Sequence, residues 1–356
     1  MTFCANHCAI GLPVQHGIII LKKFNVGIIG YGWAATAHID AINASGMAQV
    51  TRIYSSRLLD DDELSTRHGS RIKSTTNLNA MLKDPNLDVV DVTSYPYQHA
   101  DQVVAAAKAG KHIIIEKPLT LTQPGLRRIV AAVKKARVKV CVCFECRFAS
   151  QFLTIKSVVD QGLVGKIHYG EVDYYHGVGP WYGQYRWNTK KDAGGSSLLS
   201  AGCHAMDALL YFMGSTDVVE VTSYSTQSKN KIFKKYEYDT TSVTILKFKD
   251  GRLGKVASVI DCLQPYYFHT HLVGSEGSIL DNKFHSSKMG ALNKNEWSTL
   301  ATQLVDSGDV SDHPYQTQFE AFFAALRADK EMPHTSLADA ARTHEIIFAA
   351  DKSAAT

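Results

Sequence analysis

No uncharged apolar run in the 356-residue sequence reaches the roughly 18 residues that a membrane span needs. The first 22 residues also lack the basic segment and apolar core of a signal peptide, so we expect a cytoplasmic protein. Neither sign of charge predominates, because 38 Lys and Arg against 34 Asp and Glu leave a net charge of only +4. With no basic block interleaved with aromatics, the sequence indicates neither a nucleic-acid partner nor a membrane partner.

Cysteine is sparse and odd in number, with seven residues in a chain too long to depend on disulfides, so we expect free thiols. Cys141 and Cys143 alternate within an apolar, strand-like run that Cys146 follows, and we interpret them as buried strand thiols rather than metal ligands. His269 and His271 alternate onto one strand face without a carboxylate at ligand spacing. The sequence therefore predicts no metal site.

The order of the expected elements divides the chain in two, as its length also suggests at roughly 150 residues per domain. In the first half, strands and helices alternate, which is typical of a parallel sheet covered by helices. The expected strands there are 24–29, 48–54, 89–93, 112–115 and 138–144. In the second half, strand signals follow one another and predict a mostly antiparallel sheet of 167–175, 218–225, 242–248 and 254–260, framed by helices over 196–212, 315–328 and 336–351.

A glycine-rich turn separates the first expected strand from the first expected helix. Gly30 permits a tight turn, Gly32 lets a pyrophosphate approach the backbone, and Ala35 allows close helix packing. The N-terminus of the helix adds free N–H groups for the phosphates. This context indicates a dinucleotide cofactor, with Tyr31 and Trp33 among its contacts, although a simple strand-to-helix turn is the alternative.

The end of the second strand bears on the choice of cofactor. An acidic residue there would bind the ribose hydroxyls of NAD, but this chain has Ser55-Ser56-Arg57. Two hydroxyls and a guanidinium can instead receive a 2′-phosphate, so the sequence favours NADP over NAD. In the alternative interpretation, Arg57 is a solvated loop residue.

Several motifs in fixed order resemble the glucose–fructose oxidoreductase, inositol dehydrogenase and rhizopine-catabolism (Gfo/Idh/MocA) family over about residues 24–350. They are the glycine turn, Glu116-Lys117-Pro118, Arg147-Phe148, Gly194-Gly195 and Gly202-Cys203-His204. The resemblance implies an α/β protein with a Rossmann NAD(P)-binding domain (23–146) after an N-terminal extension (1–22). It also implies a C-terminal substrate-binding and oligomerisation α/β domain (147–356) with a large, mostly antiparallel open sheet.

Lys117 is the first expected catalytic residue, because it follows the carboxyl end of a parallel strand, where open α/β sheets bind their ligands. A lysine near the nicotinamide can polarise a hydroxyl or carbonyl group. A surface lysine in a loop is the alternative. The resemblance gives Glu116 a supporting role beside it at the cofactor, and makes His204 the acid/base residue, whose ordinary pKa suits proton exchange.

On the helix that follows Gly194-Gly195, Ser200, His204, Asp207 and Tyr211 fall within an arc of about 60°. We expect this polar stripe to meet a ligand or a polar partner. The family usually has Asp where this chain has Ser200, and a serine cannot hold a negative charge beside the lysine. The substrate or the reaction can therefore differ from simple polyol oxidation, and Asp207 either compensates or packs.

Further contacts are expected on weaker grounds. Pro96 and His99 resemble the family loop beneath the nicotinamide, although His99 is equally suited to a structural hydrogen bond. The aromatic segment 174–187 suits sugar rings, or else packs at a sheet edge or a subunit contact. The expected substrate contacts are Lys117, Arg147, Tyr175, Trp181, Arg186, Ser200 and His204.

The resemblance implies an NAD(P)-dependent dehydrogenase that transfers hydride to or from a sugar or cyclic polyol, with Lys117 and His204 in proton transfer. One alternative is redox-neutral glycoside hydrolysis or elimination through a transient keto-sugar with retained NAD. A second is a non-catalytic dinucleotide-binding sensor. Because an uncovered sheet is an aggregation hazard, and by analogy with the family, we expect a homodimer or homotetramer.

Overall fold

The computed structural model describes residues 22–306, 308 and 313–356, so all but Lys22 of the expected extension over 1–22 lies outside the described residues. The first half forms a six-stranded parallel sheet in the order β3-β2-β1-β4-β5-β6. Its strands are β1 (Phe24–Ile29), β2 (Ala48–Tyr54), β3 (Lys73–Thr75), β4 (Val89–Val92), β5 (His112–Ile115) and β6 (Val140–Val142). The strand order reverses between β1 and β4, and ligands bind at such a switch point, outside the carboxyl ends of the strands.

The helices that connect these strands are α1 (Trp33–Ala44), α2 (Asp61–His68), α3 (Leu78–Leu82), α4 (Pro96–Lys108) and α5 (Gln123–Ala136). Local capping determines where two of them begin. The Asp60 carboxylate accepts backbone N–H groups at the start of α2, and the Thr122 hydroxyl accepts the N–H of Gly125 in α5. The expected alternation of strands and helices is confirmed.

The second half forms an eight-stranded sheet in the order β14-β13-β12-β11-β7-β10-β9-β8, antiparallel except for the parallel pair of β10 and β7. Its strands are β7 (Ile167–Tyr175), β8 (Val218–Thr226), β9 (Thr241–Phe248), β10 (Leu253–Val259), β11 (Tyr267–Gly274), β12 (Gly277–Leu280), β13 (Lys283–Ser286) and β14 (Ser298–Thr299). The sequence prediction of a large, mostly antiparallel second sheet is confirmed.

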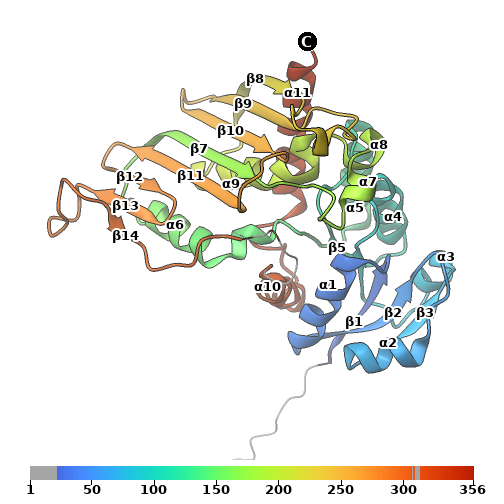
Figure 1. Cartoon of the computed structure of the whole chain (residues 1–356). Coiled ribbons are helices and arrows are strands. Elements are labelled where there is room, and N and C mark those ends of the chain that lie inside the picture. The colour runs from blue at the N-terminus through green and yellow to red at the C-terminus, as the bar shows by residue number, and fades with distance from the viewer. Residues whose placement is uncertain (1–21, 307, 309–312) are drawn as a thin grey trace, which may run out of the picture.

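Helices gather on one face of this second sheet (Figure 1). There α9 (Cys203–Met213) packs on β7 and β10, α11 (Leu337–Ala354) packs on β8, and α6 (Ser150–Asp160) lies beside α9. The expected helix over 196–212 is divided into a π-helical turn, η2 (Leu198–Gly202), and α9, all of whose residues are buried. The remaining short helices are η1 (Glu145–Phe148), α7 (Tyr185–Asn188), α8 (Lys191–Gly194) and η3 (Lys231–Phe233).

The opposite face of the second sheet is open to solvent. Side chains alternate strictly along β9, so Val243 and Ile245 are exposed while their neighbours are buried. Tyr224 on β8 is 77% exposed and Leu253 on β10 is 46% exposed. This surface, which we call the open face, therefore carries uncovered apolar side chains together with charged ones such as Lys247.

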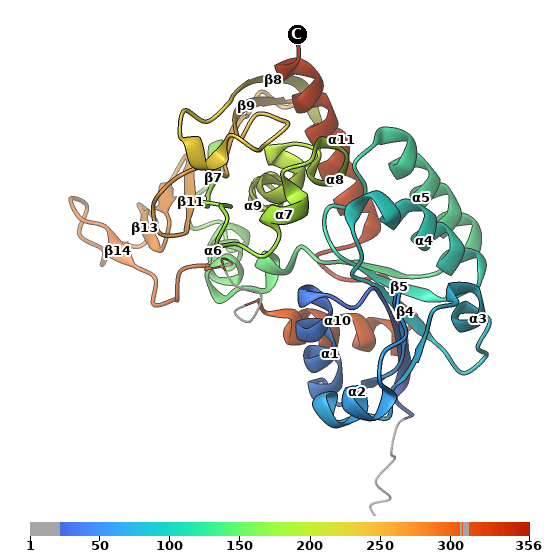
Figure 2. The same cartoon turned by 45° about the vertical axis from the view of Figure 1, so that its right-hand side comes forward.

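The helix α10 (Tyr315–Arg327) returns to the first sheet and lies beside α1 (Figure 2). Its Phe319, Phe322 and Phe323 are fully buried in the same core as Ile28 and Ile39. The first half is thus completed by a segment from the second half of the chain, and the expectation that the helix over 315–328 frames the second sheet is wrong. No described helix is long and apolar enough to cross a membrane. The five cysteines among the described residues are all free thiols.

Candidate active site

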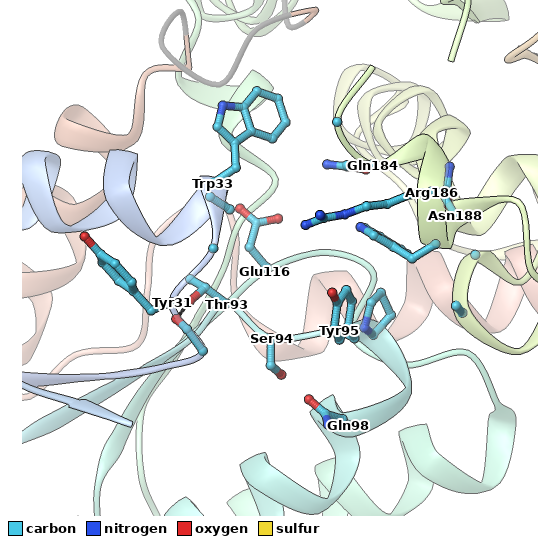
Figure 3. Close-up of a pocket in the computed structure, with 18 of the residues that line it drawn as sticks. Tyr31, Trp33, Thr93, Ser94, Tyr95, Gln98, Glu116, Gln184, Arg186 and Asn188 are labelled. Atoms are coloured by element: carbon cyan, nitrogen blue, oxygen red, sulfur yellow. Dashed lines mark hydrogen bonds between the residues drawn. The ribbon is translucent and has the colours of Figure 1, made fainter. Parts of the chain in front are cut away.

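A cleft of about 820 Å³ lies between the carboxyl ends of the parallel strands and the segment 180–200 of the second half. Figure 3 shows Trp33 and Glu116 on one side of the cleft and Arg186 facing them from α7. Its lining unites most of the residues expected to bind cofactor, namely Gly30, Tyr31, Gly32, Trp33, Ser55, Ser56, Arg57, Pro96, Glu116 and Lys117. Of the expected substrate contacts, Lys117, Arg186 and Ser200 line the same cleft.

The glycine turn fits a bound pyrophosphate. Gly30 has a φ of +97°, and a Cβ there would lie 3.0 Å from the Cα of Ser94, so the turn depends on glycine. A Cβ on Gly32 would meet nothing within 4 Å, which leaves open space on the cleft side. No side chain caps the first N–H groups of α1, and they remain available for an anion. Ala35 is fully buried, consistent with its expected role in helix packing.

The end of β2 forms the wall next to the glycine turn. Tyr54, Ser55, Ser56 and Arg57 all line the cleft there. Ser55 is nearly buried, whereas Arg57 is exposed. Glu116 is the one carboxylate among the lining residues, and it belongs to the segment after β5 rather than to this wall. This end of the cleft thus offers hydroxyls and a positive charge to a ribose.

Glu116 is fixed by a buried network. Its Oε1 accepts hydrogen bonds from His38 Nε2 at 3.0 Å and from the Tyr315 hydroxyl at 2.6 Å. His38 Nδ1 lies 2.9 Å from Asp91 Oδ2, so the imidazole bridges two carboxylates. Burial would lower the pKa of His38, but Asp91 and Glu116 raise it to about 10. Burial would raise the pKa of Glu116, but His38 and Lys117 hold it at about 2. The network is therefore charged at neutral pH.

Lys117 follows Glu116 in sequence and lines the cleft. Burial favours its neutral amine, but interactions with Cys203, Glu116 and Glu145 outweigh burial and raise the pKa of Lys117. Burial raises the pKa of the Cys203 thiol to about 12, so at neutral pH the negative charges that act on Lys117 are the two carboxylates. The side chain therefore presents an ammonium group to the cleft.

The structure does not bring His204 to the surface of the cleft. The residue is 3% exposed, and its Nε2 lies 3.7 Å from Glu145 Oε1. Burial outweighs the nearby Glu145 carboxylate and lowers the pKa of His204 to about 4, so the imidazole is neutral. Its Nδ1 has no hydrogen-bond partner among the described residues. The helical stripe therefore meets a polar partner at His204 and reaches the cleft only at Ser200.

Four other expected contacts lie outside the cleft lining. Arg147 forms a buried ion pair with Asp207 and is not exposed to a substrate. Tyr175 points to the open face, where its ring stacks on Tyr267 at 6.0 Å, because strand alternation places it opposite its buried neighbour Tyr174. The indole N–H of Trp181 donates to the Gly177 carbonyl, and the ring is 60% exposed. His99 is fully buried and bonds the carbonyls of Pro118 and Ser94.

Contrary to the expectation from the sequence, a carboxylate does lie beside His269 and His271. Pairing of β11 with β7 places Glu171 directly opposite His271, and the three side chains lie within 4.8 Å of one another. A partner on another strand has no fixed sequence spacing, so the sequence could not reveal it. Glu171 is already bonded by the Lys255 ammonium at 2.8 Å and by the Tyr169 hydroxyl at 2.9 Å.

Sequence reasoning missed Glu145, His313 and His38. Glu145 comes shortly after the carboxyl end of β6, as Lys117 comes shortly after that of β5, so the same rule applied again would have found it. His38 is on α1, and its carboxylate partners come from distant parts of the sequence, one in β4 and one directly after β5. His313 precedes α10, whose return to the first sheet had no sequence signal.

Comparison with known proteins agrees with this arrangement. Residues 24–144 match the oxidoreductase family with an NAD-binding Rossmann fold, and residues 152–280 match the GFO/IDH/MocA C-terminal domain. The chain belongs to the GFO/IDH/MocA family.

Among its relatives, myo-inositol 2-dehydrogenase of Thermotoga maritima is 30% identical, with 71% of this chain and 74% of that protein covered. Levoglucosan dehydrogenase of Pseudarthrobacter phenanthrenivorans is 26% identical over 74% of each chain. The structure of levoglucosan dehydrogenase with NADH and levoglucosan shares the fold at a TM-score of 0.80 and 24% identity, covering 94% of this chain and 98% of that one.

Proposed function

We propose that this chain is an NAD(P)-dependent dehydrogenase that transfers hydride between the cofactor and a CH–OH carbon of a neutral sugar or cyclic polyol. The observation that carries the proposal is one continuous cleft that contains both the glycine turn and the Lys117 ammonium. The relatives named above, an inositol and an anhydrosugar dehydrogenase, support the substrate class. The facing wall adds hydrogen-bonding groups from Gln184, Arg186 and Asn188, which suit hydroxyl-rich substrates.

The residues present fit a dinucleotide. The free N–H groups of α1 and the open space at Gly32 would hold the pyrophosphate, and Glu116 and Pro96, which line the same cleft, would contact the nicotinamide. Ser55, Ser56 and Arg57 would surround the adenosine ribose, which favours NADP over NAD because Arg57 can pair with a 2′-phosphate. When bound, the nicotinamide supplies the hydride acceptor or donor.

Lys117 is the residue that acts on the reacting oxygen. In the reductive direction, its ammonium donates a hydrogen bond to the substrate carbonyl and gives a proton to that oxygen as the carbon receives hydride. In the oxidative direction, the hydroxyl oxygen loses its proton to the neutral amine while the carbon loses hydride. His204 is a buried, neutral imidazole outside the cleft lining, so it does not act on the substrate directly.

The test combines cofactor binding with turnover. NADPH and NADH binding to the full chain is measured by fluorescence, and a panel of inositols, pyranoses and anhydrosugars is followed at 340 nm. We expect Lys117→Met to bind nucleotide like the wild type and to lose about 10²- to 10⁴-fold in kcat, the range of general acid–base catalysis. Lys108→Met, which removes an exposed lysine of α4, is the matched control and should change neither value. Full activity of Lys117→Met would contradict the role of the lysine.

A second function is favoured by one observation, the hydroxyl of Ser200 in the cleft lining where the family usually supplies a carboxylate. That function is redox-neutral glycoside hydrolysis or elimination through a transient keto-sugar with retained NAD. It requires that sugar is consumed without net change at 340 nm and without added cofactor. Nucleotide binding with no sugar turnover across the panel would instead support a non-catalytic sensor.

We further propose that a second copy of the chain covers the open face, which gives a homodimer or a homotetramer. The exposed Tyr224, Val243, Ile245 and Leu253 lie on three adjacent strands there. Exposed apolar side chains that share a sheet face with ion pairs such as Lys247–Glu220 are suited to a subunit contact, and an isologous contact lets one such surface cover itself.

A further inference from the structure

Glu145 is a wholly buried carboxylate that the proposed reaction does not use. It opens η1, shortly after the first sheet ends at β6, and its exposed fraction is 0%. Its Oε1 lies 3.1 Å from His313 Nε2 and 3.7 Å from His204 Nε2. Its Oε2 has no hydrogen-bond partner among the described residues. A carboxylate removed from water to this extent needs positive charge close by.

Two side chains of the kinds that bind metals face this carboxylate, His204 from α9 and Cys146 from η1. All three residues, which we call the buried cluster, are at most 3% exposed, and one ligand atom of each lies within 4.8 Å of the other two. Cys146 Sγ lies 3.6 Å from Glu145 Oε1. His204 Nε2, at 3.7 Å, is too distant for a hydrogen bond to that oxygen, and its Nδ1 has no partner among the described residues.

The spacing within the buried cluster is that of a zinc site. Zinc binds nitrogen and oxygen at about 2.0–2.2 Å and sulfur at about 2.3 Å in a tetrahedron, so its ligand atoms lie roughly 3.3–3.6 Å apart. The distances of 3.6 and 3.7 Å to Glu145 Oε1 are close to this spacing. We propose that Glu145, Cys146 and His204 bind a zinc ion through a carboxylate oxygen, the sulfur and an imidazole nitrogen. Three protein ligands leave the fourth position of the tetrahedron for water.

The charges of the buried cluster suit a divalent cation. Without an ion, the Cys146 thiol donates its proton to Glu145 Oε1 in a hydrogen bond. A thiol that binds zinc loses that proton, so the site then holds one carboxylate, one thiolate and one neutral imidazole. Their two negative charges balance the two positive charges of zinc, and no net charge is buried. His313 Nε2, 3.1 Å from Glu145 Oε1, is placed to orient the carboxylate as an outer partner of the site.

A zinc ion here would join the two halves of the chain. It would link η1, which follows the first sheet, to α9 beneath the second, the same two elements that the ion pair of Arg147 and Asp207 connects. The sequence predicted no metal site, because Cys146 was assigned to a strand that in fact ends at Val142, and because His204 lies far along the chain. The inference does not depend on the proposed reaction.

The first experiment uses the untagged wild-type chain, kept reduced. It is incubated with zinc chloride and gel-filtered, and inductively coupled plasma mass spectrometry should find about one zinc ion per chain. After a chelator has removed the zinc, Co²⁺ alone is added. We expect the visible absorption of a tetrahedral cobalt site and a near-ultraviolet band from thiolate to cobalt. A chain that holds no zinc, or that binds cobalt without the thiolate band, would overturn the proposal, and neither result requires a variant that folds.

Variants assign the ion to the buried cluster. Loss of an outer partner costs about 10- to 100-fold in metal affinity, which we expect for His313→Gln, and loss of a ligand in Cys146→Ser or His204→Gln should cost at least about 100-fold. Cys262→Ser alters a half-buried thiol elsewhere, and His271→Gln alters the group of Glu171, His269 and His271 on the open face. These two controls should keep the zinc. Zinc retained by the ligand variants, or lost from His271→Gln, would overturn the assignment.

Discussion

The guanidinium of Arg147 binds both carboxylate oxygens of Asp207, with Nε 2.6 Å from Oδ2 and Nη2 2.7 Å from Oδ1. Arg147 belongs to η1, at the end of the first sheet, and Asp207 to α9, beneath the second. Thr343 of α11 donates to the same carboxylate at 3.2 Å. The pair thus joins three segments at the junction of the two halves and keeps α9 in place beside the cleft.

Arg147→Met should destabilise the protein by about 3–5 kcal/mol, the usual effect of leaving one partner of a buried ion pair uncompensated. Thermal unfolding should show a clearly lower Tm, while nucleotide binding at low temperature stays close to wild type because Arg147 does not line the cleft. The double variant Arg147→Met with Asp207→Leu should recover part of the loss, since it leaves no buried charge unpaired. A weaker affinity for sugar with an unchanged Tm would instead support the expected role of Arg147 as a substrate contact.

The case of Arg147 marks a limit of sequence reasoning. Helical periodicity correctly placed His204 and Asp207 on one polar stripe, because the repeat of a helix is fixed. The partner of that stripe depends on how helices from distant parts of the chain pack, and periodicity holds no information on this. Within the stripe, Asp207 binds Arg147 and His204 lies near Glu145, whereas Ser200 lines the cleft.

The first sheet and the cofactor end of the cleft could be predicted more fully. There, strand, turn and helix are consecutive in sequence, so Gly30, Gly32 and Arg57 were placed together by local rules. The substrate end is assembled from loops and distant helices. Trp181 and Tyr175 have suitable chemistry for a sugar, yet loop conformation and strand alternation direct them elsewhere.

Two glycines of the turn should respond differently to the same substitution. Gly30→Val adds a side chain at a positive φ, against the backbone of Ser94, and should lower the Tm. Gly32→Val adds one to open space where the pyrophosphate would lie, and should leave the Tm unchanged. Its Kd for both NADPH and NADH should rise at least about tenfold, or 1.4 kcal/mol. Equal nucleotide affinity in Gly32→Val and wild type would contradict the role of the glycine turn in pyrophosphate binding.

The proposed assembly through the open face can be tested by introducing a charged residue there. Val243→Asp places a carboxylate beside Tyr224 and Ala257 on the open face, where a second copy would bury it. We expect light scattering to show a dimer or tetramer for the wild type and smaller species for the variant. Val130→Asp alters an exposed apolar residue of α5, away from the open face, and serves as the control. A wild-type chain that is monomeric at micromolar concentration would contradict the proposed assembly.

The preference for NADP depends on Arg57, the cation at the ribose end of the cleft. A hydrogen bond to a charged group contributes about 1.5–3 kcal/mol, so Arg57→Ala should weaken NADPH binding by about 10- to 100-fold. NADH has no 2′-phosphate, and its Kd should change less than about twofold on the same energy scale. Arg128→Ala removes an exposed arginine of α5 and controls for net charge. Equal losses for the two nucleotides in Arg57→Ala would show that the guanidinium does not bind the phosphate. Raised ionic strength should weaken NADPH more than NADH in the wild type and remove that difference in the variant.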